Sequence, residues 1–169
     1  MKQLYTVLLL ALFTFTASAQ NADWKTKEDY LRDTAQVAQT ILWLEQAPFP
    51  DNFKERQEKA LYAFKWLEGA PYHVNIDATF LQPIMEDAKF AYKDMMMPQF
   101  VFGKGLYLIK SNGAQDELKA NLRGIESMVI LYRNIKAKDT RAKNKLLEKM
   151  ETLLARNELE AYVKKQMKL

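Results

Sequence analysis

Apolar residues recur at the three- and four-residue spacing of an α-helix along most of this chain, while glycine and proline occur at only a few points between the apolar stretches. The pattern Thr26-x-x-Asp29 resembles a capping box and predicts the start of a first helix. That helix should end before Pro48, because a residue that precedes proline is disfavoured in the α region. A second helix is predicted from Asn52-x-x-Glu55 to Pro71. The side chains expected to face the core are Leu31, Ala35, Ala38 and Leu42 in the first helix, and Ala60, Leu61, Phe64 and Leu67 in the second.

Two helices are predicted in the middle of the chain. One begins at Asp77 or Thr79 and runs to about Met97. The next begins at Pro98 and ends at Asn112-Gly113, a common C-terminal signal. The run VFGKGLYLI at 101–109 also fits a pair of strands, so both a helix and a hairpin are open interpretations of this segment.

Three further helices are predicted in the C-terminal part. A long helix with one apolar face comes first, Asp139 caps the next, and Asn157-x-x-Glu160 begins a short last helix. Their expected core residues are, in order, Leu118, Leu122, Ile125, Val129 and Tyr132; Leu147, Met150 and Leu154; and Leu159, Tyr162 and Val163. Because short connections make neighbouring helices antiparallel, the sequence predicts an all-α fold, an antiparallel helical bundle of about five to seven helices.

The heptapeptide WLEQAPF at 43–49 is nearly repeated as WLEGAPY at 66–72. Each copy combines the last turn of a predicted helix with a proline stop. If the two helices are antiparallel, Trp43 and Trp66 lie near opposite ends of the bundle and are largely buried. Glu45 and Glu68 are then much farther apart than the roughly 5–9.5 Å that separates paired catalytic carboxylates. The repeat therefore indicates two similar helix ends rather than a duplicated site.

A signal peptide is predicted at residues 1–19. Lys2 precedes a short apolar run, and Ala17-Ser18-Ala19 has the small-x-small pattern that signal peptidase cuts. The run is shorter than the roughly 20 residues of a membrane anchor, and we expect no transmembrane segment in the mature chain. We therefore expect a single helical domain at 20–169, exported to the periplasm or secreted from the cell. The chain has no cysteine, so packing alone must stabilise it.

Few side chains suited to catalysis are present. His73 is the single histidine, and Ser111 and Ser127 are the only serines after residue 19. Neither GxSxG nor HExxH occurs. Met95–Met97 and His73 are soft ligands of the kind that bind Cu(I), but three consecutive methionines diverge around a helix. The sequence predicts no cofactor and no metal site, so an enzyme would have to use Asp, Glu, Tyr and Lys.

Charge is distributed unevenly along the chain. Residues 133–169 contain eleven Lys or Arg against five Asp or Glu, whereas residues 20–132 contain thirteen against sixteen. Such a basic segment suits an anionic glycan, a lipid headgroup or an acidic protein, and its simpler interpretation is a solvated helix surface. Nucleic acid is not expected, because no aromatic residue lies between Arg141 and Asn157 to stack on bases. The candidate contact residues are Arg141, Lys143, Lys145 and Lys149.

Several segments resemble uncharacterised small exported all-helical proteins of Bacteroidetes type. They are the predicted cleavage site before Gln20, the two WLExAP helix ends, GIESMVILYR at 124–133 and NELEAYVKK at 157–165. The resemblance implies an exported helical protein. It implies no activity, and it supplies no catalytic residues.

Three classes of function fit these observations. The first is a non-catalytic binding or scaffolding module that uses its basic C-terminal third. The second is a periplasmic carrier of a small apolar ligand, held between helices near Met95–Phe102. The third is a carboxylate-based glycan-processing enzyme. A deep pocket with two facing carboxylates would favour the enzyme, a dry apolar groove would favour the carrier, and the lack of both would favour the module.

Export predicts a processed N-terminus. Protein recovered from an expressing cell should have the mass of a chain that begins at Gln20, because Ala17-Ser18-Ala19 directs cleavage after Ala19. Intact-mass measurement of the soluble protein checks this. Recovery of a soluble chain that still begins at Met1 would contradict it.

Overall fold

The computed structural model describes residues 23–49, 53–76 and 78–169. Within these residues the chain forms eight α-helices, one short 3-10 helix and no strand. This confirms the all-α prediction, with one helix more than the expected range. The elements are α1 (Lys27–Arg32), α2 (Thr34–Gln46), α3 (Phe53–Gly69), η1 (Thr79–Leu81), α4 (Gln82–Met85), α5 (Lys93–Lys110), α6 (Glu117–Lys138), α7 (Lys145–Ala155) and α8 (Leu159–Met167). The predicted signal peptide lies outside the described residues.

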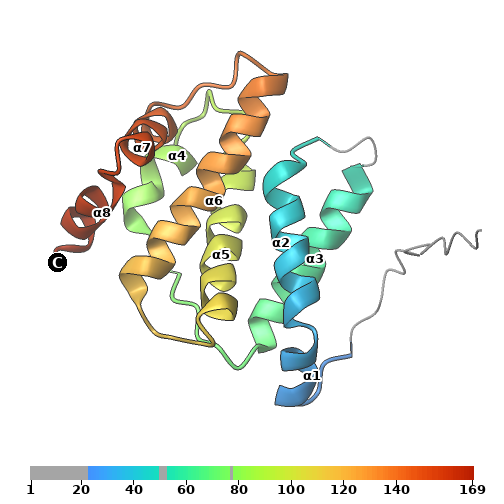
Figure 1. Cartoon of the computed structure of the whole chain (residues 1–169). Coiled ribbons are helices and arrows are strands. Elements are labelled where there is room, and N and C mark those ends of the chain that lie inside the picture. The colour runs from blue at the N-terminus through green and yellow to red at the C-terminus, as the bar shows by residue number, and fades with distance from the viewer. Residues whose placement is uncertain (1–22, 50–52, 77) are drawn as a thin grey trace, which may run out of the picture.

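The antiparallel hairpin of α5 and α6 forms the centre of the molecule (Figure 1). The pair α2 and α3 packs on one side of this hairpin, and α4, α7 and α8 pack on the other (Figure 1). Among the described residues, no helix is both long enough and apolar enough to span a bilayer.

Two glycines set the distance between α5 and α6. A Cβ atom on Gly103 would lie 2.6 Å from the Cβ of Ser127 and 2.7 Å from the carbonyl oxygen of Arg123. A Cβ on Gly124 would lie 2.6 Å from the Phe100 ring and 2.9 Å from its carbonyl oxygen. Carbon atoms do not approach this closely, so the two backbones touch only because both positions lack a side chain.

The core has two parts that share α5. Phe102 and Leu106 of α5 pack with the buried side of α2 and α3, which includes the fully buried Trp66. On the other side of α5, Phe100 packs into a larger cluster that reaches from α4 to α8. The hairpin therefore separates two apolar clusters and is buried by both.

The first predicted helix is divided in two at Asp33. The capping box of Thr26 and Asp29 is present, as predicted. The α-helix ends at Arg32, however, and Asp33 has ψ near zero before α2 begins. The indole Nε1 of Trp24 donates a hydrogen bond of 2.7 Å to Asp33 Oδ2, which holds this break in place.

The predicted boundary at Pro98 is wrong. Residues 86–92 form turns between α4 and α5, and Pro98 lies inside α5. Proline removes the hydrogen bond to the Asp94 carbonyl, and Asp94 is exposed, so water can hydrate that oxygen. Residues 101–109 are helical, which rules out the hairpin interpretation. The predicted stop is confirmed, since Asn112 and Gly113 both have positive φ.

Two predicted helix starts also differ. Asn144, not Asp139, caps α7, because its side chain accepts hydrogen bonds from the backbone N–H groups of Leu146 and Leu147. Asn157 has a φ of 57° and terminates α7 instead of starting α8. Asn adopts this left-handed conformation readily, which suits it to a helix end. Its short side chain also accepts hydrogen bonds from backbone N–H groups, which suits it to a helix start, so the residue type alone does not separate the two.

The predicted apolar faces of the first two helices are correct only in part. Ala38, Leu42, Ala60 and Leu67 pack against the core as predicted, at its edge. Val37, Ile41 and Leu44 face the core from α2, whereas Leu31 and Ala35 are exposed. Ala63 and Trp66 face it from α3, whereas Leu61 and Phe64 are exposed.

The repeated heptapeptides end two antiparallel helices, α2 and α3, at opposite ends of the bundle, as predicted (Figure 1). Trp66 is fully buried, and Trp43 is half-buried with the Lys59 ammonium 5.1 Å from its ring centre. Glu45 is buried and Glu68 is exposed. The two copies of the repeat are therefore similar in sequence but lie in different environments.

The glycine contact yields a stability prediction. Gly124→Ala should lower the free energy of unfolding by about 1–3 kcal/mol, because the new methyl group meets the Phe100 backbone as well as its ring. This loss should appear although alanine favours a helix by about 1 kcal/mol over glycine. Gly105→Ala is the control, since its Cβ would meet only the Leu67 side chain, which can move. Urea unfolding measures both, and equal stability of the two variants would contradict the prediction.

Candidate functional site

The four predicted contact residues lie on one continuous stretch. Arg141 and Lys143 are on the connection between α6 and α7, Lys145 is the first residue of α7, and Lys149 lies one turn further along. All four side chains are exposed. We call these four residues the basic α7 surface. Their proximity follows from the sequence, in which they span nine positions, and the structure adds that none of them is buried.

The connection that carries this surface is tied to the core. Asn144 is buried, and its Nδ2 donates a hydrogen bond of 2.9 Å to Asp87 Oδ2. The hydroxyl of the buried Tyr132 accepts from the Asn144 backbone N–H at 3.2 Å and donates to the Ala142 carbonyl at 3.3 Å. Burial raises the pKa of the Tyr132 phenol, which therefore stays neutral and able to donate. The lysines are thus presented from a fixed segment.

Arg141 is partly neutralised by a neighbouring carboxylate. Asp139 Oδ1 accepts hydrogen bonds of 3.0 Å from both Nε and the backbone N–H of Arg141. Its other oxygen accepts from the Tyr92 hydroxyl at 2.8 Å. The hydrogen bonds from Arg141 and Tyr92 stabilise the charged carboxylate and lower the pKa of Asp139 to about 2. Asp139, predicted as a helix cap, instead fixes the end of α6 and orients Arg141.

The other three cations differ in their contacts with neighbouring side chains. Lys149 lies with its Nζ 4.4 Å from the centre of the Tyr162 ring, a cation–π contact that holds the side chain against α8. Lys143 and Lys145 form no ion pair with any residue that the structure describes. These two lysines are the strongest candidates for contact with an anion.

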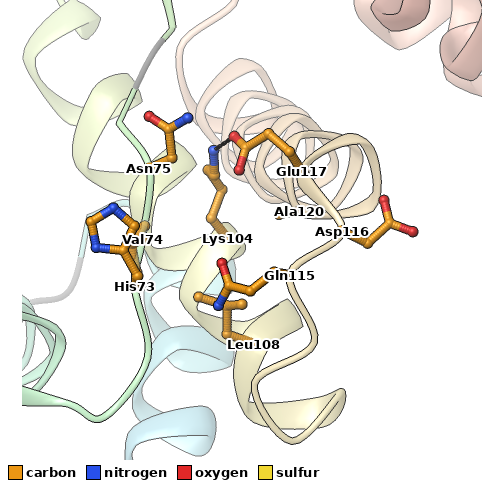
Figure 2. Close-up of a pocket in the computed structure, with 9 residues that line it drawn as sticks. All are labelled: His73, Val74, Asn75, Lys104, Leu108, Gln115, Asp116, Glu117 and Ala120. Carbon is orange, nitrogen blue, oxygen red and sulfur yellow. Dashed lines mark hydrogen bonds and ion pairs between the residues drawn. The ribbon is translucent and has the colours of Figure 1, made fainter.

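Sequence analysis missed a second polar site, which is built around Lys104. This side chain is 1% exposed, although a lysine is rarely buried. Its Nζ is bound to Glu117 Oε1 and donates a hydrogen bond of 2.9 Å to Asn121 Oδ1 (Figure 2). A detectable signal was available, because Lys104 is the only charged residue between Asp94 and Lys110. A single charge within an apolar helix indicates a buried partner.

The hollow beside Lys104 is small. Its lining includes His73, Val74 and Gln115, and the space between the side chains is about 190 Å³ including its opening to solvent. A site for a small-molecule ligand usually has about 300–1,000 Å³. The Lys104 hollow is therefore smaller than a usual ligand site, and the ion pair of Lys104 with Glu117 lies at its wall.

The two carboxylates of this hollow do not face each other. Glu117 points toward Lys104, while Asp116 points away from it (Figure 2). Asp116 caps α6 by accepting a hydrogen bond of 3.0 Å from the Lys119 backbone N–H. Each carboxylate already has a structural role, so they do not form the acid–base pair of a glycosidase.

Buried polar contacts also join α2 to the rest of the molecule. Glu45, which is 1% exposed, forms an ion pair with Arg123 of α6. Arg56 of α3 donates hydrogen bonds to the carbonyl oxygens of Leu44 and Ala47, at 2.8 and 2.6 Å, and so closes the C-terminal end of α2. Burial lowers the pKa of Arg56 to about 10. These contacts join the C-terminal end of α2 to α3 and α6.

The side chains considered as copper ligands lie in different surroundings. Met96 is fully buried, and Met95 and Met97 pack against the same apolar cluster. His73 is exposed and lines the Lys104 hollow, whose lining contains no methionine. No group of three or more His, Asp or Glu side chains in the described part of the chain is arranged to hold a metal ion.

No protein-family model, curated protein or solved structure matches this chain.

The Asp139 contacts yield a prediction about pH. Tyr92→Phe should raise the pKa of Asp139 from about 2 toward the ordinary value of 3.8, because one hydrogen bond to the carboxylate is lost. Since the folded pKa is the lower one, this carboxylate stabilises the fold above about pH 4, and the stabilisation disappears as the pH falls through about 2. Carboxyl carbon shifts in an NMR titration measure the change.

Asp29 serves as an internal control in the same spectra. Its pKa is also lowered to about 2, by the capping box with Thr26, which does not involve Tyr92. The pKa of Asp29 should be unchanged in the Tyr92→Phe variant. An unchanged pKa of Asp139, or an equal change in the pKa of both carboxylates, would contradict the assigned hydrogen bond.

Proposed function

We propose that this protein is an exported, non-catalytic helical binding module that contacts an anionic partner through the basic α7 surface. The observation that carries the proposal is the position of Lys143 and Lys145, which are exposed and have no carboxylate partner in the described part of the chain.

The position of these lysines at the start of α7 favours the binding of an anion. They flank Asn144, the N-cap of a helix of 11 residues. The N-terminus of a helix carries a partial positive charge, so lysines there are less favourable than acidic residues by about 0.3–1 kcal/mol each. A bound anion would relieve this repulsion and would be attracted by the side chains and the helix end together. An anionic glycan, a lipid headgroup and an acidic protein all supply that charge.

The carrier hypothesis has less support. It needs an apolar groove near Met95–Phe102, but Met96, Phe100 and Phe102 are between 0% and 3% exposed and pack within the core. The hollow beside Lys104 is lined mainly by polar and charged side chains and is smaller than a usual ligand site. These residues are occupied with helix packing.

The enzyme hypothesis has less support as well. Neither the Lys104 hollow nor the Glu45–Arg123 pair offers two facing carboxylates, because each acidic group is held by a cation or by a backbone N–H. Together with the scarcity of nucleophiles in the sequence, this favours a binding role.

Binding to three anionic probes tests the proposal: heparin, vesicles that contain phosphatidylglycerol, and polyglutamate. The variant Lys143→Gln/Lys145→Gln/Lys149→Gln should bind at least one probe about 100-fold more weakly. Each lysine near an anionic surface contributes about 1 kcal/mol, and about 3 kcal/mol corresponds to that factor. Raising the salt concentration should weaken binding of the unmodified protein, because the screening length is about 8 Å at physiological ionic strength.

A second triple variant, Lys25→Gln/Lys27→Gln/Lys110→Gln, provides the control. It removes the same charge from exposed positions just before and at the start of α1 and at the end of α5, away from α7 (Figure 1). Binding should fall much less in this variant. An equal loss in both variants would indicate attraction by net charge alone, and a lack of binding to all three probes would refute the proposal.

A further inference from the structure

Helix α3 exposes apolar side chains on its outer face. Leu61 is 54% exposed and Phe64 is 46% exposed, although sequence analysis predicted both to face the core. The core-facing side of α3 is occupied by Arg56, Ala63 and Trp66. Leu61 and Phe64 lie three positions apart on the helix, so they form one short apolar strip on its outer face.

The outer face has the spacing of a coiled-coil seam. Gln57, Leu61, Phe64 and Glu68 follow one another at intervals of four, three and four residues. These positions fall on one stripe of a helix, with Leu61 and Phe64 at its centre. Glu58 and Lys65 each lie next to this stripe, on the same side and one heptad apart.

The charges of Glu58 and Lys65 determine which arrangement fits. In an antiparallel pair of identical helices, equivalent flanking positions face each other, so Glu58 of one copy lies opposite Lys65 of the other, and this occurs twice by symmetry. The same register places Leu61 of each copy against Phe64 of the other. In a parallel pair, Glu58 and Lys65 would each face positions on the other side of the stripe, where Phe53 and Ala60 carry no charge. Self-complementarity therefore exists only in the antiparallel pair.

We infer that the protein forms a symmetric homodimer in which α3 packs antiparallel against α3 of a second copy. Leu61 and Phe64 form the apolar centre of the interface, and Glu58 and Lys65 form two ion pairs at its edge. The apolar strip is short compared with the roughly 800 Å² that each partner contributes to a stable interface. The dimer is therefore weak and depends on concentration. Because α3 and α7 lie on opposite sides of the α5–α6 hairpin, dimerisation leaves the basic α7 surface accessible (Figure 1).

Sedimentation equilibrium of the purified protein over about 1 µM to about 1 mM tests the inference, since this range covers weak association. Leu61→Gln/Phe64→Gln should raise the dimer dissociation constant at least about 30-fold, because both central contacts are lost. Ile76→Gln is the matched control. It removes a side chain that is 58% exposed but lies outside α3, and it should leave the constant within about twofold.

Charge reversal tests the orientation. Glu58→Lys alone or Lys65→Glu alone should raise the dissociation constant about tenfold, because each creates two like-charge contacts. The double variant Glu58→Lys/Lys65→Glu should restore it to within about threefold of the original, since both pairs are formed again with reversed sign. Circular dichroism should show a folded helical protein in all variants, because both side chains are exposed and Glu58→Lys removes only the exposed ion pair of Glu58 with Lys54.

Three results would overturn the inference. They are a protein that stays monomeric at every concentration, a dimer that is insensitive to Leu61→Gln/Phe64→Gln, and a double charge variant that dimerises no better than the single ones. None of them depends on binding to heparin, vesicles or polyglutamate, so the dimer and the proposed function can fail separately.

Discussion

The contact between Gly103 and Gly124 determines how close α5 and α6 can lie, and the other helices are placed against the pair that results. At this point the helices meet backbone to backbone, with the Phe100 ring packed over Gly124 and Ser127 packed beside Gly103. A methyl group at either glycine would push the axes apart. Both apolar clusters include side chains of α5, so a change in this distance would alter the packing of both.

Buried polar contacts connect the outer helices to this hairpin. Glu45 of α2 pairs with Arg123 of α6, and Asn134 of α6 donates to the Glu45 carbonyl at 3.0 Å. Lys104 of α5 pairs with Glu117 at the start of α6. Buried ion pairs contribute little net stability compared with apolar packing, but an unpaired buried charge is costly, so such pairs disfavour other arrangements of the same helices. We therefore regard them as contacts that specify which helix faces which.

Two exposed surfaces of the molecule carry side chains that these internal contacts do not use. The basic α7 surface is held by Asn144, Tyr132 and Asp139, and its lysines point outward from a fixed connection. The outer face of α3 combines Leu61 and Phe64 with flanking charges of opposite sign. A weak dimer through α3 would present two basic surfaces at once. Two linked sites bind a repetitive anionic surface more tightly than one site does, which makes the two proposals compatible.

Local signals in the sequence determined the helical class, the capping box at Thr26, the stop at Asn112-Gly113 and much of the apolar face of α6, because each depends on residues within one or two turns. The exposed cations near α7 were found in the same way. Tertiary structure decided which sides of α2 and α3 are buried, that Pro98 lies inside a helix, and that Lys104 and Glu45 are internal. Periodicity shows that a helix has an apolar side, but neighbouring helices decide which side they cover. Glu45 finds its partner 78 residues away, and only the folded chain brings such a distant pair together.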